Sequence, residues 1–345
     1  MKVLVIGGTR FIGMFAVQAL LELGCRITMI NRSGPKVFDG RVTWIQGNRN
    51  DERVMMDVLR HTRPDVVLDM IPVTESQAEL LVRACAKQSP RIVSISSMDV
   101  YKAFGIILGI ESHDGHLQPV PLREDAPLRS RLFPYREPTP RSPDDPQRIM
   151  DDYDKIPVED RVMNSQSIRG TVVRLPFVYG PFDTQHRMWE YLKRMMDRRP
   201  YILIDEVMAG WRSSRGYAAN MGYGIAQAVT DERAADAIFN LADEPTMSIL
   251  EWVRAIATAV GWKGTILTTG PETTPPHLRV SMNAAQHLIG DTGKIRSMLA
   301  YSERVEHTEG ILRTVEWESA HPPELSPEQI EAVFDYDAED RVITV

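Results

Sequence analysis

The sequence has little cysteine and contains no long apolar run. Only two cysteines, Cys25 and Cys85, occur in 345 residues, and both lie in apolar stretches. A disulfide-rich secreted fold is therefore disfavoured, and we expect buried, reduced thiols in a cytoplasmic protein. No apolar stretch reaches the ~20 residues of a membrane-spanning helix, so we expect no membrane association. The apolar run after Lys2 is interrupted by Gly7 and Gly8, which favours a strand and a turn over a signal peptide.

The sequence also lacks an excess of basic residues and an obvious metal-binding cluster. Its formal net charge is −7, whereas nucleic-acid binding needs a basic face, so nucleic acid is not expected as a partner. His113 and His116 lie close together, but no third ligand has a suitable spacing, and we expect no metal. A Gly-x-Ser-x-Gly motif is missing too, so nothing indicates a hydrolase. A small-molecule substrate is the expected partner.

The first half of the chain alternates apolar runs with segments of helical periodicity. Short, continuous apolar runs are typical of buried parallel strands, and strands that alternate with helices indicate a doubly wound sheet. We therefore predict an α/β fold, a Rossmann doubly wound parallel sheet, in which ligands lie beyond the carboxyl ends of the strands. The predicted strands are residues 3–6, 26–30, 42–45, 66–68 and 92–95, and residues 174–181 are predicted to form a sixth strand and its exit.

A glycine-rich turn, GGTRFIG (residues 7–13), follows the first predicted strand and opens a helix. Glycine permits the tight turn and the close approach of helix and sheet, while the helix N-terminus offers N–H groups to a phosphate. This arrangement predicts a dinucleotide site. Arg10 is unusual, because most such turns have glycine at this position. The residues predicted to bind the cofactor here are Gly7, Thr9, Arg10, Phe11, Ile12 and Gly13.

The segment after the second strand indicates which dinucleotide is bound. NAD-selective sites usually place a carboxylate here to hold the ribose 2′-hydroxyl, but none occurs between Ile27 and Lys36. Arg32 and Arg10 instead suit a 2′-phosphate, so we predict NADP in preference to NAD. The cofactor site is further expected to include Asn31, Ser33, Asn48 near the adenine, Arg49, Met70, Ile71 and Pro72.

Five motifs resemble the extended short-chain dehydrogenase/reductase superfamily, and within it the NAD(P)-dependent epimerases and dehydratases. They are GGTRFIG (7–13), VSISSMDVY (93–101), VVRLPFVYGP (172–181), IFNLADEPTMSILEW (238–252) and DTGKIR (291–296). The resemblance implies substrates that are often nucleotide sugars. It also implies that a Ser, a Tyr and a Lys perform the chemistry, and that a homodimer formed through helices flanking the sheet is an option. The serine that lies four residues before the motif's Tyr101 is Ser97.

The tyrosine and lysine depart from the family pattern Tyr-x-x-x-Lys. Tyr153 precedes Lys155 by two residues, and the position one turn before Lys155 is Asp151. On a continuous helix, residues two apart face in directions about 200° apart. If Pro157 lies in the first turn of the helix, however, Tyr153 to Lys155 is extended and both side chains point to the same side.

Three interpretations of this stretch remain open. In the first, Tyr153 is the acid/base and Lys155 tunes it. In the second, Lys155 holds the nicotinamide ribose while Asp151 or another group transfers the proton. In the third, the chain binds the cofactor without family-type redox chemistry.

The resemblance also assigns residues on the substrate side. Pro176 and Val178 are expected at the nicotinamide, and Phe177 and Arg215 at the substrate, with Arg215 holding a phosphate. A long connection between Tyr101 and Asp151 includes arginines that could serve a lid over an anionic substrate, among them Arg129, Arg131, Arg136 and Arg141.

A chain of this length allows about two domains. We expect an NADP-binding Rossmann domain over residues 1–178, with part of 211–242 returning to it. A smaller, mixed substrate domain is expected over 179–210 and 243–323, followed by an acidic tail over 324–345.

The predicted function is that of an NADP-dependent oxidoreductase or epimerase/dehydratase acting on a hydroxyl or carbonyl group, with a nucleotide sugar as a candidate substrate. One alternative is a cofactor-binding sensor or scaffold without turnover. The other is RNA binding, because the GGTRFIG turn also looks like that of chloroplast stem-loop RNA-binding relatives in the superfamily.

Overall fold

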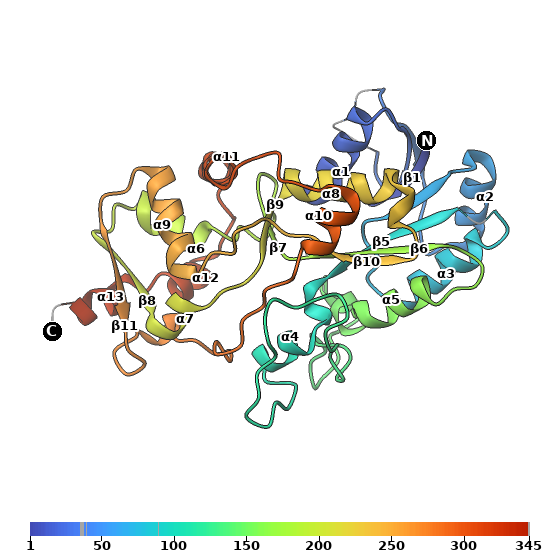
Figure 1. Ribbon diagram of the computed structural model, residues 1–345. Coiled ribbons are helices and arrows are strands. Elements are labelled where there is room, and N and C mark those ends of the chain that lie inside the picture. Colours follow the sequence, from blue (N-terminus) through green and yellow to red (C-terminus); the bar gives the residue numbers. More distant parts are fainter. Residues whose placement is uncertain (35–37, 39, 89, 344–345) are drawn as a thin grey trace.

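A seven-stranded parallel sheet forms the centre of the larger part of the molecule (Figure 1). The computed structural model describes residues 1–34, 38, 40–88 and 90–343. The strand order is β10-β6-β5-β4-β1-β2-β3, which confirms the predicted doubly wound sheet. Every residue of β4 and β6 is buried, as parallel strands covered on both faces require. The strands are β1 Lys2–Ile6, β2 Arg26–Asn31, β3 Thr43–Gln46, β4 Val66–Asp69, β5 Arg91–Ser97, β6 Gly170–Leu175 and β10 Ala237–Asn240.

Helices cover both faces of this sheet. One layer is formed by α1 (Phe11–Glu22), α8 (Ala218–Thr230) and α10 (Gly293–Leu299), and the other by α2 (Glu52–Thr62), α3 (Glu75–Cys85) and α5 (Lys155–Met163). Cys25 and Cys85 are buried free thiols, as expected. Within the described residues, no helix has the length and apolar character to cross a membrane.

A smaller region lies beside the sheet, at the left of Figure 1. Its β8 (Tyr201–Asp205) and β11 (Thr265–Thr269) form a parallel pair. A capping box formed by Ser248 and Glu251 starts α9. The helices of this region are α6 Trp189–Met196, α7 Glu206–Gly210, α9 Ile249–Val260, α11 His307–Ala320, α12 Pro327–Val333 and α13 Tyr336–Ile343.

A short parallel pair, β7 (Phe177–Tyr179) with β9 (Arg215–Tyr217), connects the two parts of the molecule. A hydrophobic core also spans the connection, because Tyr101 and α4 (Lys102–Ile107) pack into the same cluster as Trp252. α10 lies against β10 of the large sheet, although the sequence places it within the expected substrate domain.

The acidic C-terminal segment is folded onto the smaller region. The carboxylate of Glu339 on α13 is fully buried and accepts hydrogen bonds from Arg194 of α6 at 3.0 and 2.6 Å. His277 contacts the same carboxylate at 3.2 Å. The expected tail therefore supplies a buried ion pair to the structure.

Candidate active site

The glycine turn after β1 has the geometry of a phosphate-binding loop. Gly7 has a φ of +86°, which favours glycine, and a Cβ atom there would lie 2.8 Å from Ile71 Cγ1. A Cβ atom at Gly13 would lie 2.6 Å from the Gly7 carbonyl oxygen, so glycine lets α1 pack close to the turn. No side chain caps the N-terminus of α1, which leaves its first N–H groups for a ligand.

Arg10 adopts an ordinary backbone conformation in this turn. Its φ of −135° and ψ of 148° are extended, so the position does not require glycine. The left-handed conformation falls instead on Phe11, whose φ is +38°. The Arg10 side chain is exposed, beside the turn. The structure thus explains how arginine can replace the usual glycine.

The carboxyl end of β2 offers hydrogen-bond donors for an adenosine ribose. The indole N–H of Trp44 donates to Asn31 Oδ1, and among the described residues the buried Asn31 Nδ2 has no partner. Ser33 and Arg32 are exposed. Within the described part of the chain, neither Arg32 nor Arg10 forms an ion pair. Both guanidiniums are thus open to an anionic ligand at this end of the site.

Arg49 has a structural role that the sequence did not indicate. Its guanidinium donates to both carboxylate oxygens of Asp69 at 2.6 and 2.7 Å, and to the Ile71 carbonyl oxygen at 2.9 Å. The Arg49 guanidinium is therefore occupied by groups at the end of β4 and is not free to bind a cofactor phosphate. The segment that it holds is Met70, Ile71 and Pro72, the expected wall of the cofactor channel. Asn48 is exposed, and its side chain accepts from the Asn50 N–H at 3.0 Å.

A cleft of about 500 Å³ opens beyond the carboxyl ends of β5 and β6. Its walls combine hydroxyl groups, one carboxylate and aromatic rings from segments that lie far apart in the sequence. The lining residues are Ser97, Met98, Asp99, Phe104, Tyr135, Met150, Tyr153, Leu175, Pro176, Phe177, Gln185, Arg187, Ser214 and Leu288.

Tyr153 and Lys155 lie side by side at this cleft. Helix α5 begins at Lys155, its N-cap Asp154 is extended, and Pro157 lies in the first turn. The backbone between Tyr153 and Lys155 is thus extended, as Pro157 predicted, and Lys155 Nζ lies 5.5 Å from the centre of the Tyr153 ring. Lys155 Nζ donates to the carbonyl oxygens of Pro72 at 2.7 Å and Ile95 at 3.2 Å. The ammonium therefore lies at the carboxyl ends of β4 and β5, beside the expected cofactor channel.

The surroundings of Tyr153 and Lys155 do not favour ionisation of the tyrosine. Burial lowers the pKa of Lys155 to about 8, against the opposing effects of Asp99 and Asp69. Burial and the Asp99 carboxylate hold the pKa of Tyr153 well above its ordinary value. Tyr153 is therefore a neutral phenol at physiological pH, and its hydroxyl donates to Asp99 Oδ2 at 2.8 Å.

Asp151 does not face the cleft. Its carboxylate pairs with Arg141, and it also accepts from the Arg141 backbone N–H at 2.9 Å and from Arg148 at 3.4 Å. Although burial opposes the effect, these hydrogen bonds from Arg141 lower the pKa of Asp151. The interpretation in which Asp151 replaces the family's tyrosine therefore lacks geometric support.

The arginines of the long connection hold the chain on either side of Tyr153. Arg129 pairs with Asp154 at 3.1 Å, both side chains being fully buried. Arg136 contacts Asp152 at 3.4 Å, and Arg141 pairs with Asp151. These three arginines are thus occupied by aspartates of the DDYD segment, while Arg131 is exposed. Arg129, Arg136 and Arg141, which were expected to serve a lid over an anion, instead hold the candidate catalytic segment in place.

A second polar network anchors α5 behind the cleft. Glu159 accepts from Arg174 of β6 at 2.9 and 2.7 Å and from Ser96 at 2.5 Å. Arg174 also donates to the Tyr101 hydroxyl at 3.0 Å, and Tyr101 donates to Asn240 at 2.7 Å. Lys155 and Glu159 thus have different surroundings on α5. Lys155 lies beside Tyr153, whereas Glu159 belongs to the polar network behind the cleft.

The residues assigned to the substrate side do not all line the cleft. Phe177 and Pro176 line it, whereas Val178 is buried in the core of the Rossmann part. Arg215 is paired with Phe177 across β7 and β9, and its guanidinium lies 4.8 Å from the Trp252 ring centre. Among the described residues, Arg215 has no carboxylate within ion-pair distance. Burial lowers its pKa to about 10, so it still carries a charge suited to an anionic group.

Sequence reasoning missed two members of the site, Asp99 and Tyr135. Asp99 is 5% exposed, and its Oδ2 accepts from Tyr153 and, at 3.3 Å, from Tyr135. The rings of Tyr135 and Tyr153 are 5.3 Å apart. A carboxylate two residues after Ser97 in a strand-end motif was a usable indication for Asp99. Nothing in the irregular connection around Tyr135 gave a comparable one.

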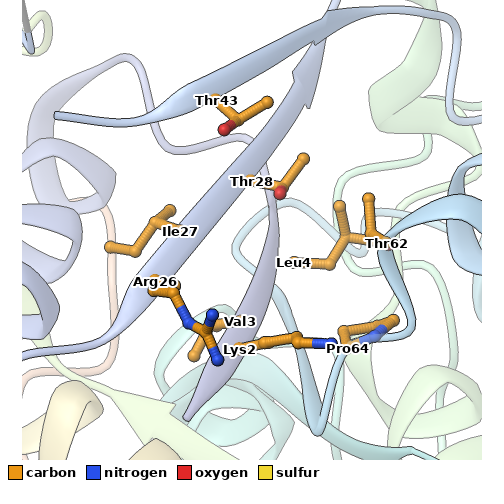
Figure 2. Close-up of a pocket in the computed structure, with 9 residues that line it drawn as sticks. All are labelled: Lys2, Val3, Leu4, Arg26, Ile27, Thr28, Thr43, Thr62 and Pro64. Carbon is orange, nitrogen blue, oxygen red and sulfur yellow. The ribbon is translucent and has the colours of Figure 1, made fainter. Parts of the chain in front are cut away.

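Another hollow, of about 200 Å³, lies at the amino ends of β1 and β2 (Figure 2). Arg26, Lys2 and several threonines line it, and both cations are exposed. This edge is opposite the glycine turn, whereas ligands of doubly wound sheets bind at the carboxyl ends. We assign no role to it.

The sheet, the glycine turn and the cleft define a protein with the fold of the extended short-chain dehydrogenases/reductases. Residues 3–123 match the model of the NAD dependent epimerase/dehydratase family, in agreement with the resemblance that the sequence motifs indicate.

Solved structures of low sequence identity share the fold. The UDP-glucose 4-epimerase of Thermotoga maritima with UDP-glucose has a TM-score of 0.65 and 18% identity, covering 93% of this chain and 99% of that one. That of Bifidobacterium longum, in complex with NAD+ and UDP, has a TM-score of 0.66 and 14% identity, with coverage of 93% and 99%.

Two curated proteins are similar in sequence. The chloroplast stem-loop binding protein of 41 kDa b from Arabidopsis thaliana is 22% identical over 276 residues, which are 76% of this chain. An uncharacterised protein of Sinorhizobium fredii is 27% identical over 170 residues, which are 42% of this chain. The chain spans 64% of the length of the first and 46% of the second.

Proposed function

We propose that this protein is a nicotinamide-dinucleotide-dependent oxidoreductase or epimerase/dehydratase that acts on a hydroxyl or carbonyl group. The observation that carries the proposal is that Ser97 and Tyr153 line one cleft, with Lys155 Nζ 5.5 Å from the centre of the Tyr153 ring. A nucleotide sugar is the proposed substrate class. The uncompensated charge of Arg215, next to the cleft, and the epimerases of similar fold support it.

The residues present fit a dinucleotide. The uncapped N-terminus of α1 would hold the pyrophosphate, and Lys155, which donates to two carbonyl oxygens, retains a third N–H for the nicotinamide ribose. When bound, the nicotinamide would supply the hydride acceptor or donor. Ser97 would hydrogen-bond the substrate oxygen, and the Tyr153 hydroxyl would exchange a proton with it.

The cofactor choice that we propose is NADP. Arg10 and Arg32 are exposed and unpaired within the described residues, and no carboxylate follows β2 as far as Lys36. The matching family is described as NAD dependent, and the Bifidobacterium epimerase was solved with NAD+. Direct comparison of the two dissociation constants tests this choice, and tighter binding of NAD would overturn it.

Turnover is tested with nucleotide sugars and simple alcohols or ketones, followed by cofactor absorbance and product analysis. Tyr153→Phe should abolish turnover while leaving the dissociation constant of the cofactor within a factor of about two. Cofactor binding without turnover on any substrate would favour a sensor or scaffold, and unchanged turnover in the variant would remove Tyr153 from the mechanism.

RNA binding is a second candidate, favoured by the similarity to the stem-loop binding protein. The net charge of −7 opposes it. A filter-binding assay with a stem-loop RNA at two salt concentrations decides between the candidates, because genuine RNA binding weakens steeply as salt rises.

A further inference from the structure

The Asp99 carboxylate is placed to take part in the chemistry proposed for the cleft. It is 5% exposed, lines the cleft and accepts the only proton that the Tyr153 hydroxyl can donate, at 2.8 Å. Its other oxygen, Oδ1, is buried and has no partner in the part of the chain that the structure describes. Because the proton of Tyr153 is directed at Asp99, the lone pairs of the Tyr153 oxygen are left to accept a proton from a substrate hydroxyl.

A neutral tyrosine cannot accept a proton unless it gives up its own. In this site Tyr153 is partly buried beside a carboxylate, an environment that disfavours tyrosinate. The Lys155 ammonium lies over the Tyr153 ring, 5.5 Å from the ring centre. A proton acceptor in contact with the Tyr153 hydroxyl removes the need for a preformed tyrosinate.

We propose that Asp99 is the proton-accepting partner of Tyr153, so that the two groups form a relay between the substrate oxygen and a buried carboxylate. This inference rests on the proposed oxidoreductase function. During oxidation of a substrate alcohol, the hydroxyl proton passes to the Tyr153 oxygen while the proton of Tyr153 passes to Asp99 Oδ2. The C–H bond breaks, its electron pair leaves with the hydrogen to the oxidised nicotinamide, and the carbonyl forms. Reduction reverses each transfer.

The groups that face this pair come from several elements. Tyr135, from the long connection, donates to the same Asp99 oxygen at 3.3 Å, and Arg129 donates to the Asp99 backbone oxygen at 2.6 Å. Burial raises the pKa of Asp99, and among its neighbours Arg129 and Lys155 oppose that rise while Asp154 adds to it.

The first test is made on the protein without cofactor, by NMR of tyrosines labelled with carbon-13 at Cζ. The Tyr153 signal is identified by its loss in Tyr153→Phe. In the wild type it should remain that of a phenol beyond the pH at which a free tyrosine ionises. Asp99→Asn keeps an acceptor but removes the charge, so the ionisation of Tyr153 should move down by about one pH unit or more. Asp57→Asn, an exposed change on α2, should leave it in place. An unchanged Tyr153 titration in Asp99→Asn would overturn the contact.

The second test uses the pH profile of turnover. Asp99 accepts a proton only when ionised, so kcat of the wild type should fall on the acid side. In Asp99→Asn, kcat should be lower by about 10²-fold, and its decrease at low pH should disappear, with the cofactor dissociation constant unchanged.

If Tyr153→Phe abolishes turnover but Asp99→Asn does not lower it, the relay is wrong and the proposed function stands. If neither the wild type nor any variant binds a dinucleotide, the proposed function fails. The NMR titration then still decides whether the Asp99 carboxylate raises the pKa of Tyr153.

Discussion

Tyr153 and Lys155 meet at the cleft because the backbone between them is extended and α5 starts at Lys155. Pro157 made this arrangement predictable, since proline is confined to the first turn of a helix. The contact of Tyr153 with Asp99 was not predictable in the same way. It joins residues 54 apart in the chain, and it depends on how the irregular connection before Tyr153 folds.

At the residue scale, the cofactor preference can be tested at Arg32. Arg32→Ala should weaken NADP binding by about 10–100-fold, because one charge-assisted hydrogen bond to the 2′-phosphate is lost. Binding of NAD should not change, since NAD has no such phosphate. Isothermal titration calorimetry with both dinucleotides measures the effect, with the exposed Arg60→Ala on α2 as the control. An equal loss of affinity for NADP and NAD would show that Arg32 does not recognise the 2′-phosphate.

At the scale of elements, α5 and the long connection hold each other. The strand and helix pattern of the first half was readable from apolar periodicity, and the glycine turn from its spacing. The connection has no periodicity, so the pairing of its arginines with Asp151, Asp152 and Asp154 could not be read from the sequence. The sequence shows only that this segment is rich in arginine and aspartate, and not which of these residues pair.

The element-scale prediction concerns Asp154, which pairs with the buried Arg129 and caps α5 by accepting from the Ile156 N–H at 2.9 Å. Asp154→Asn leaves the Arg129 charge buried without compensation, so the free energy of unfolding should fall by about 3–5 kcal/mol. Chemical denaturation measures this loss. Asp160→Asn, an exposed change on the same helix, should stay within about 0.5 kcal/mol of the wild type. Equal stability of the two variants would contradict this role of the Arg129–Asp154 pair.

At the scale of the whole molecule, the two parts share a core and the C-terminal helices complete the smaller part. The expected acidic tail was readable as composition, but its docking depends on Arg194 and Glu339, which lie 145 residues apart. Glu339→Gln should lower the free energy of unfolding by about 3–5 kcal/mol, because Arg194 is then buried without a countercharge. The matched control is Glu331→Gln, an exposed position on α12. A thermal unfolding midpoint that is the same for both variants would refute a structural role for the segment.

The pH dependence of stability is a second whole-molecule prediction, and it centres on Glu318. This side chain is fully buried, and burial raises its pKa from 4.5 to about 7. The unfolded chain loses this proton first, so stability is full below pH 4.5 and falls as the pH rises through 7. Glu318→Gln should therefore match the wild type at pH 5 and exceed it at pH 8 by about 1–3 kcal/mol. Denaturation at both pH values, with Glu316→Gln as the exposed control, checks the difference, and a pH-independent effect would contradict it.

The order of strands in the large sheet has a consequence for the protein during its synthesis. β6 ends at Leu175, but its outer neighbour β10 begins only at Ala237, after the chain has left the sheet to build α6, β8 and α7. At about 5–20 residues per second, a ribosome leaves the outer edge of β6 without its partner for several seconds. An unpaired strand edge is a template for aggregation. Yield in a cell should therefore respond to chaperones that bind nascent chains, and slow codons between residues 175 and 237 should lower the soluble fraction.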